Sequence, residues 1–243
     1  MRKSFLQISF GLGVLIFYVL LGSLLMKVLP GVDGVLFWHA LGVVIGFLFN
    51  QYMGVDGGPL EINTPKFVEI LLWFIVVFIT CFVGQCLAYS ILYNVGDNAF
   101  NTYQKFTNID PVMYLMISLL FAPMSEELIF RGILYKSFRN NLGHPIISAI
   151  VVSLIFALAH GTMVHLFVGF SLSLLSIIIL EITGNILNNF YTHVLYNFLA
   201  VILPSVASVF PFMRSLVFMS FLALSVLTGL ILALWRVYKT KGV

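Results

Sequence analysis

The chain has 243 residues, of which 61% are hydrophobic and only 9% are charged, with a formal net charge of +3. A soluble domain carries about a quarter charged residues, so the composition excludes an ordinary soluble protein, and without a basic tract it gives no sign of nucleic-acid binding. Long apolar stretches recur from end to end. They predict an all-α, polytopic integral membrane protein with a single domain over residues 1–243.

Eight apolar stretches are long enough to form membrane helices. In chain order they are 5–26, 35–53, 67–93, 112–130, 145–160, 162–180, 186–203 and 212–235. The fifth and sixth are short and separated only by a Gly-Thr break, so a hairpin that does not fully cross stays open as an alternative for them. The polar and aromatic segment 98–110 is expected to lie on the outer membrane interface.

Lys and Arg are unequally shared between the two sides of this arrangement. With the N-terminus inside, nine fall on the cytosolic side: Arg2, Lys3, Lys66, Arg131, Lys136, Arg139, Arg236, Lys239 and Lys241. Three fall on the other side: Lys27, Lys105 and Arg214. Because Lys and Arg favour cytosolic loops, we expect eight transmembrane helices with both termini in the cytosol.

The stretch SEELIFRGILY (125–135) places three charges inside an apolar segment. A charge at the centre of a membrane helix costs about 2.5–3.5 kcal/mol on insertion scales, so such residues normally face the protein interior and are paired. Glu127 and Arg131 are four residues apart with the acid first, the favourable order for a helical ion pair. Glu126 points about 100° away from Glu127 around the helix. The spacing therefore pairs Glu127 with Arg131 and leaves Glu126 available.

His160 is expected at the same depth as Glu126. Each lies about 16 or 17 residues from the turn at 141–143, which corresponds to roughly 25 Å along two antiparallel helices. Phe156 is one turn before His160 on the same face and is expected to form a wall of the site. The basic residues after Glu126 place this level in the cytosolic half of the bilayer.

The seventh stretch adds two polar residues on one helix face. His193 and Asn197 are four residues apart and stand roughly 12 and 18 Å along their helix from Asn185, near the same depth. Considered alone, they fit interhelical hydrogen bonding as well as chemistry. His39 is interpreted as a packing residue and Glu181 as a solvated residue at a helix end.

The residue types favour amide hydrolysis by activated water. There is no G-x-S-x-G setting for a serine nucleophile, no H-E-x-x-H zinc motif, and the aspartates all lie near predicted segment ends. A glutamate and a histidine remain to activate water, with a His/Asn pair to donate hydrogen bonds to an oxyanion. A zinc ion held by the two glutamates and two histidines stays open as an alternative.

Three motifs in this order resemble a known family. EELIFR (126–131), FALAH (156–160) and HVLYN (193–197) are similar to the EExxxR, FxxxH and HxxxN motifs of the CPBP family of intramembrane glutamate proteases, which comprises CAAX proteases and bacteriocin-processing (Abi) proteins. The resemblance covers a core of about 111–203. It implies eight helices around a polar intramembrane cavity that opens toward the cytosol.

The resemblance also implies a role for each motif residue. Glu126 would be the base that activates water with the help of His160, and His193 and Asn197 would stabilise the oxyanion. The ion-paired glutamate and arginine of the first motif would organise the site. The implied enzyme is a metal-independent glutamate-type protease without a cofactor.

The expected function is hydrolysis of a peptide bond in a membrane-associated peptide or protein by a bacterial family member in the plasma membrane. Bacteriocin or pheromone processing and self-immunity are the biological roles that the family suggests. The alternative is a non-proteolytic scaffold that binds a sensor kinase or another membrane protein. An ion or proton transporter is a third reading, although the charges gather at one depth and form no path across the bilayer. The expected partners are membrane lipid and a membrane-associated substrate, and no nucleic acid.

Overall fold

The computed structural model describes residues 2–52, 67–95, 110–142, 144–160, 163–207 and 210–241, and within these ranges it contains helices and no strands. The long helices are α1 (Arg2–Val28), α2 (Val32–Tyr52), α3 (Phe67–Val95), α8 (Pro145–Ala159), α9 (Met163–Thr183), α10 (Ile186–Ala207) and α11 (Leu216–Lys241). One continuous helical segment precedes α8 and consists of α5 (Pro111–Met116), η1 (Ile117–Phe121), α6 (Ala122–Glu126), η2 (Glu127–Tyr135) and α7 (Lys136–Leu142). A short η3 (Pro211–Arg214) precedes α11. The all-α prediction is confirmed.

Six described segments are long and apolar enough to cross a membrane. They are Leu6–Val28, Val32–Phe49, Trp73–Ile91, Pro111–Leu142, Leu166–Thr183 and Leu216–Thr240. The 15 residues of α8 span about 22 Å, less than the roughly 30 Å of the hydrocarbon core. The length of α10 suffices, but polar side chains interrupt its apolar sequence. The chain is a multi-pass membrane protein, while the count of eight crossings and the orientation stay predictions.

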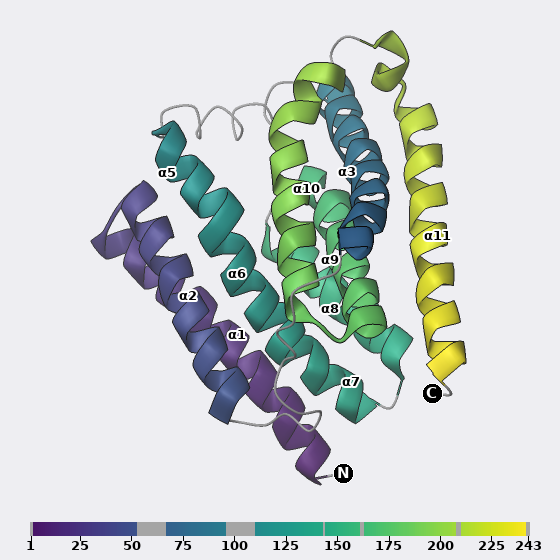
Figure 1. Cartoon of the computed structure of the whole chain (residues 1–243). Coiled ribbons are helices and arrows are strands. Elements are labelled where there is room, and N and C mark those ends of the chain that lie inside the picture. Colours follow the sequence, from purple (N-terminus) through teal and green to yellow (C-terminus); the bar gives the residue numbers. More distant parts are fainter. Residues whose placement is uncertain are drawn as a thin grey trace.

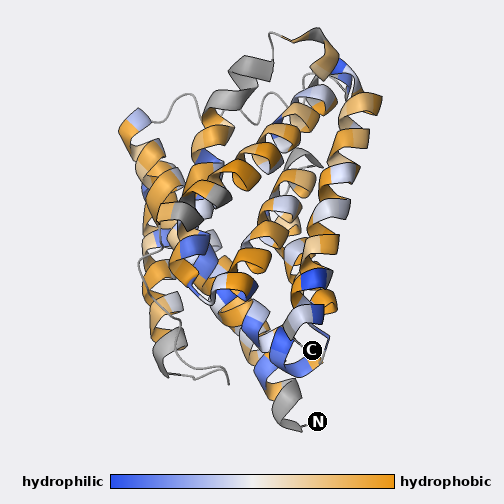
Figure 2. Cartoon of the chain, turned by 45° about the vertical axis from the view of Figure 1, so that its right-hand side comes forward, coloured by the Kyte–Doolittle hydropathy of each residue, from blue (hydrophilic) through white to orange (hydrophobic). Residues whose placement is uncertain are grey.

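The long helices run alternately up and down, and both termini lie at the same end of the bundle (Figure 1). Hydrophobic residues cover most of the helix length, and hydrophilic residues gather near the labelled termini (Figure 2). This arrangement agrees with an even number of crossings. The segment 98–110 lies outside the described residues except for Asp110, which caps the N-terminus of α5 through hydrogen bonds from Val112 N and Met113 N.

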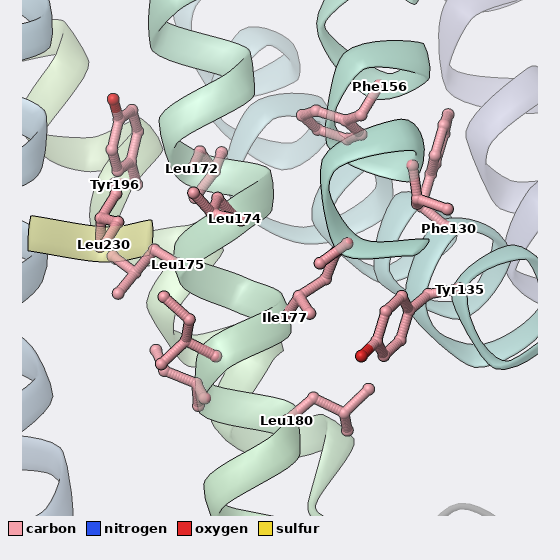
Figure 3. Packing of buried hydrophobic residues seen from close by; sticks show 14 of the residues in the cluster. Phe130, Tyr135, Phe156, Leu172, Leu174, Leu175, Ile177, Leu180, Tyr196 and Leu230 are labelled. Carbon is pink, nitrogen blue, oxygen red and sulfur yellow. The ribbon is translucent and has the colours of Figure 1, made fainter. Parts of the chain in front are cut away.

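The centre of the bundle is α9, which packs against α3, α8, α10 and α11. Its residues 171–181 are all buried, and Leu174 and Ile177 are among the side chains that point into the core in Figure 3. Serines at 171, 173 and 176 interrupt this run. Small side chains at such positions let membrane helices approach closely. This packing fixes the position of α10, which carries two of the predicted site residues.

The predicted location of Glu181 at a solvated helix end is wrong. Because α9 continues to Thr183 and is covered by neighbouring helices, the Glu181 side chain is only 7% exposed. Its Oε1 lies 2.7 Å from Arg139 Nε and accepts a hydrogen bond from Tyr135 Oη at 2.9 Å. Tyr135 is also hydrogen-bonded to the hydroxyl of Tyr238. This polar cluster ties η2, α7, α9 and α11 together near the end of the bundle where the termini lie.

The helices α1 and α2 approach the predicted catalytic segment closely because α2 carries a glycine at the contact. A Cβ at Gly42 would lie 2.5 Å from a ring carbon of Tyr18 and 2.9 Å from Ser125 Cβ. Real Cβ atoms do not approach other carbons this closely. Gly42 therefore sets the distance between α2, α1 and the residue before Glu126.

The variant Gly42→Ala is expected to lower the free energy of unfolding by about 1–3 kcal/mol, because the added methyl group meets the rigid Tyr18 ring. Thermal unfolding in detergent measures the effect. Gly13→Ala is the matched control, since no atom lies within 4 Å of the place that its added methyl group would take. Equal midpoints for the two variants would show that the close approach does not matter.

The continuous segment 111–142 extends 12 residues beyond the predicted end at residue 130, and it is not α-helical throughout. Residues 117–121 and 127–135 form π-helices. π-Helical turns are rare and are frequently found at functional sites. The two adjacent glutamates lie at the junction where α6 passes into η2.

Candidate active site

Glu127 and Arg131 form the predicted ion pair in the interior. Glu127 Oε1 lies 3.1 Å from Arg131 Nη1, and the side chains are 1% and 0% exposed. The contact is an ion pair by distance but does not have hydrogen-bond geometry. The Arg131 guanidinium carbon also lies 4.5 Å from the centroid of the Phe156 ring, a cation–π distance. The prediction of this pair is confirmed.

His193 lies between the two glutamates. Its Nδ1 is 2.7 Å from Glu127 Oε1, and its Nε2 is 3.7 Å from Glu126 Oε2. Because an ionised carboxylate only accepts hydrogen bonds, Nδ1 carries the proton toward Glu127. The distance to Glu126 exceeds that of a hydrogen bond. Glu126, whose side chain is 14% exposed, is therefore the more accessible and the less tightly held of the two carboxylates.

Asn189 is a site residue that sequence reasoning missed. Its Nδ2 donates to the backbone oxygen of Ser176 at 2.8 Å and lies 3.4 Å from Glu127 Oε2. Asn189 precedes His193 by four residues and Asn197 by eight, so it shares their helix face. That spacing was the signal available in the sequence.

Asn197 contacts the same helical segment at Ser118, eight residues before Glu126. Its Nδ2 donates to the backbone oxygen of Ser118, within η1, at 2.8 Å. The prediction that His193 and Asn197 face one side is confirmed by their contacts, because both side chains reach the segment 111–142. The hydrogen bond fixes the amide but uses one of its two N–H groups.

His160 ends α8 and is the exposed member of the set. Its Nδ1 lies 2.8 Å from the backbone oxygen of Phe156. Since a carbonyl oxygen only accepts, Nδ1 carries a proton and Nε2 of the neutral ring is the acceptor. The Phe156 ring centroid lies 4.7 Å from that of His160 and 6.1 Å from that of His193. Phe156 therefore lies against both histidines, and its role as a wall of the site stays a prediction.

The interpretation of His39 as a packing residue is incomplete. Its Nδ1 lies 2.8 Å from both Ser125 Oγ and Tyr18 Oη. It is also close enough to Glu126, His160 and His193 to interact with them electrostatically. His39 and Tyr18 come from helices outside the three motifs, so no motif spacing points to them.

A narrow pocket lies between α3 and α10, with Trp73, Phe74 and Leu195 among its lining residues. Its lining includes none of the six predicted site residues. The polar intramembrane cavity implied by the resemblance stays a prediction. Among the described residues, no group of three or more His, Cys, Asp and Glu side chains is arranged to hold a metal ion.

Residues 108–199 match the family described as type II CAAX prenyl endopeptidase Rce1-like. This segment is a CAAX-protease domain. It contains all six motif residues, and the predicted resemblance to the CPBP family is confirmed. Neither the curated proteins nor the solved structures compared with the chain gave a match.

The CAAX-protease domain covers α5 through most of α10, overlapping the predicted core of about 111–203. Its family consists of proteases, so the match of these residues supports a peptidase. Tyr18 and His39 lie outside the matched residues, although they contact Ser125 within them. Two helices that precede the domain therefore reach the residue next to Glu126.

Proposed function

We propose that the chain is an intramembrane endopeptidase that hydrolyses a peptide bond in a membrane-associated peptide, with Glu126 as the base that activates water. The observation that carries the proposal is the position of His193 between Glu126 and the buried Glu127–Arg131 pair, inside a CAAX-protease domain. This arrangement brings an accessible carboxylate, an imidazole and a charge-balancing pair to one place. General-base catalysis in such a setting typically contributes about 10²–10⁴-fold in rate.

In the proposed reaction, water attacks the carbonyl carbon of the scissile amide while Glu126 accepts its proton. His160 helps to orient the water through Nε2, because its Nδ1 proton is already directed to the Phe156 carbonyl. The carbonyl oxygen becomes an oxyanion. Glu126 then passes the proton to the amide nitrogen, the C–N bond breaks, and a new carboxyl terminus and a new amine leave the site.

The oxyanion is proposed to receive hydrogen bonds from His193 Nε2 and from the second N–H of Asn197. A proton on Nε2, in addition to the one on Nδ1 that faces Glu127, makes the His193 ring an imidazolium. Its positive charge and that of Arg131 together balance the two glutamates. A net charge of zero over these four side chains suits a site inside the membrane, where an unbalanced charge is costly.

The test uses the purified chain in lipid vesicles with two candidate peptides, one with a farnesylated CaaX-type C-terminus and one unmodified hydrophobic leader peptide. Mass spectrometry of the products identifies the cleaved bond. We expect the wild-type protein to cleave at least one class of peptide at a single bond. A purified, folded protein that binds these peptides and releases no fragment would instead favour the scaffold function.

The proposed mechanism uses no metal ion, so cleavage is expected to survive dialysis against a strong chelator. Metal analysis of the dialysed protein accompanies the assay. Loss of cleavage that zinc restores would replace Glu126 as the water-activating group by a metal-bound hydroxide.

Asn197→Ala is expected to lower kcat by about 10²–10³-fold and to leave a trace of activity, because one oxyanion donor is lost. Asn94→Ala is the matched control: Asn94 Nδ2 also donates to backbone oxygens, those of Ser90 at 2.7 Å and Arg214 at 2.9 Å, but between α3 and η3. Steady-state kinetics of both variants distinguish an oxyanion donor from a residue that only holds helices together. Similar losses in both would mean that Asn197 acts only by holding helices together.

A further inference from the structure

We propose that His39 is a positioning residue of the same site, acting through Ser125 on Glu126. The inference rests on the proposed function for its kinetic consequences. Its structural basis is independent of that function, because it consists of hydrogen bonds and packing between α1, α2 and α6. It adds two helices from outside the CAAX-protease domain to the machinery of the site.

The connection begins with a triangle of polar groups. His39 Nδ1 lies 2.8 Å from Tyr18 Oη and 2.8 Å from Ser125 Oγ, and the two hydroxyl oxygens lie 3.2 Å apart. All three side chains are buried. Ser125 Oγ also donates to the backbone oxygen of Ala122 at 3.0 Å. The triangle therefore bonds α1 and α2 to the turn of α6 that ends at Glu126.

The His39 ring is held in its orientation by packing as well as by hydrogen bonds. The Trp38 ring stacks on Tyr18 and on His39, with centroid distances of 4.9 and 4.8 Å. Trp38 Nε1 donates to the backbone oxygen of Tyr18 at 2.8 Å. Gly42 lets the two helices come close enough for these contacts. A side chain fixed on both sides in this way is pre-organised, as a functional group requires.

The position of Ser125 connects this cluster to the chemistry. Ser125 immediately precedes Glu126, and its side chain is fully buried. Glu126 is the last residue of α6 and immediately precedes the π-helical η2, where the backbone departs from regular α-helix geometry. The hydrogen bond between Ser125 and His39 links this junction to α2, which belongs to a different part of the chain. We infer that this link holds the backbone at Glu126 in place.

The same cluster lies beside the other ionisable groups. His39 is close enough to Glu126, His160 and His193 to interact with each electrostatically. A ring displaced from this position would change the surroundings of Glu126 as well as its backbone. A misplacement of about 1 Å in a catalytic group costs up to about 10²-fold in rate.

The test compares His39→Ala, His39→Asn and Ser125→Ala. Asparagine places an amide near the position of Nδ1 but nothing near that of Nε2, so it can keep the bond to Ser125. We expect His39→Ala and Ser125→Ala each to lower kcat by about 10–100-fold with KM unchanged, and His39→Asn to restore most of kcat. His39→Ala and Ser125→Ala break the same connection. The double variant His39→Ala/Ser125→Ala is therefore expected to lose no more kcat than the more damaging of the two single variants.

A second readout does not need protease activity. Dicyclohexylcarbodiimide modifies protonated carboxyl groups in apolar surroundings, and mass spectrometry of the digested protein reports the rate of modification at Glu126. We expect this rate to change in His39→Ala and Ser125→Ala and to return toward the wild-type rate in His39→Asn. If the chain shows no proteolysis, the labelling alone decides whether His39 positions Glu126.

His144→Ala is the matched control, since His144 is an exposed histidine ahead of α8. It is expected to leave both readouts at wild-type values. Wild-type kcat and labelling in His39→Ala would overturn the proposal. Failure of the folded His39→Asn protein to recover either readout, or fully additive losses in the double variant, would also overturn it.

Discussion

Glu126→Gln is expected to abolish measurable turnover, with kcat reduced by at least about 10²–10⁴-fold. Glutamine keeps the size of the side chain but cannot accept the proton of the attacking water. The substitution also removes one of the two glutamate charges that balance Arg131 and His193, so a modest loss of stability is expected. Kinetics in vesicles with thermal unfolding of the same preparation measure both quantities.

Glu181→Gln is the matched control for this variant. Glu181 is also a buried glutamate in an ion pair, but its partners are Arg139 and Tyr135 near the end of the bundle. We expect its loss to lower the unfolding midpoint while kcat stays close to the wild-type value. Turnover by Glu126→Gln comparable to that of Glu181→Gln would remove Glu126 from the reaction.

Arg131→Met is expected to lower the free energy of unfolding by about 3–5 kcal/mol, because it leaves the buried Glu127 carboxylate without its counter-ion. Methionine fills much of the volume of the arginine side chain and keeps an apolar contact with Phe156. The hydrogen bonds from His193 and Asn189 to Glu127 remain, but the one positive charge proposed for His193 cannot balance both glutamates. Denaturant titration in detergent measures the loss.

Two further variants test this explanation. The double variant Glu127→Gln/Arg131→Met removes both charges and is expected to recover a large part of the lost stability. Arg236→Met, at an exposed position of α11, is expected to leave stability unchanged. A double variant no more stable than Arg131→Met would show that the arginine acts through packing rather than through charge.

The sequence predicts those parts of the site that depend on spacing within one helix. The four-residue step from Glu127 to Arg131 survives the change from α- to π-helix, because the two side chains still meet at 3.1 Å. The same step predicts the shared face of His193 and Asn197. Apolar stretch lengths predict the helices, since burial in lipid requires such runs wherever a helix crosses.

The parts that depend on tertiary contacts could not be predicted in this way. His39 and Tyr18 meet Ser125 only because Gly42 lets α2 approach, and no local pattern records that approach. Glu181 is buried because residues of α7 and α11 cover the end of α9, although the helix ends only two residues after it. Asn189 could have been found from the sequence, because it lies four residues before His193 and therefore on the same face of α10. The family motif does not include that position.

The proposed hydrolysis is tested most directly by the intact mass of peptide fragments formed in vesicles in water enriched in ¹⁸O. We expect the wild-type protein to release two fragments from a single bond, with one heavy oxygen in the new carboxyl terminus, and the Glu126→Gln protein to release neither. Fragments formed equally by both proteins, or a wild-type protein that binds peptide and never cleaves it, would contradict hydrolysis directed by Glu126.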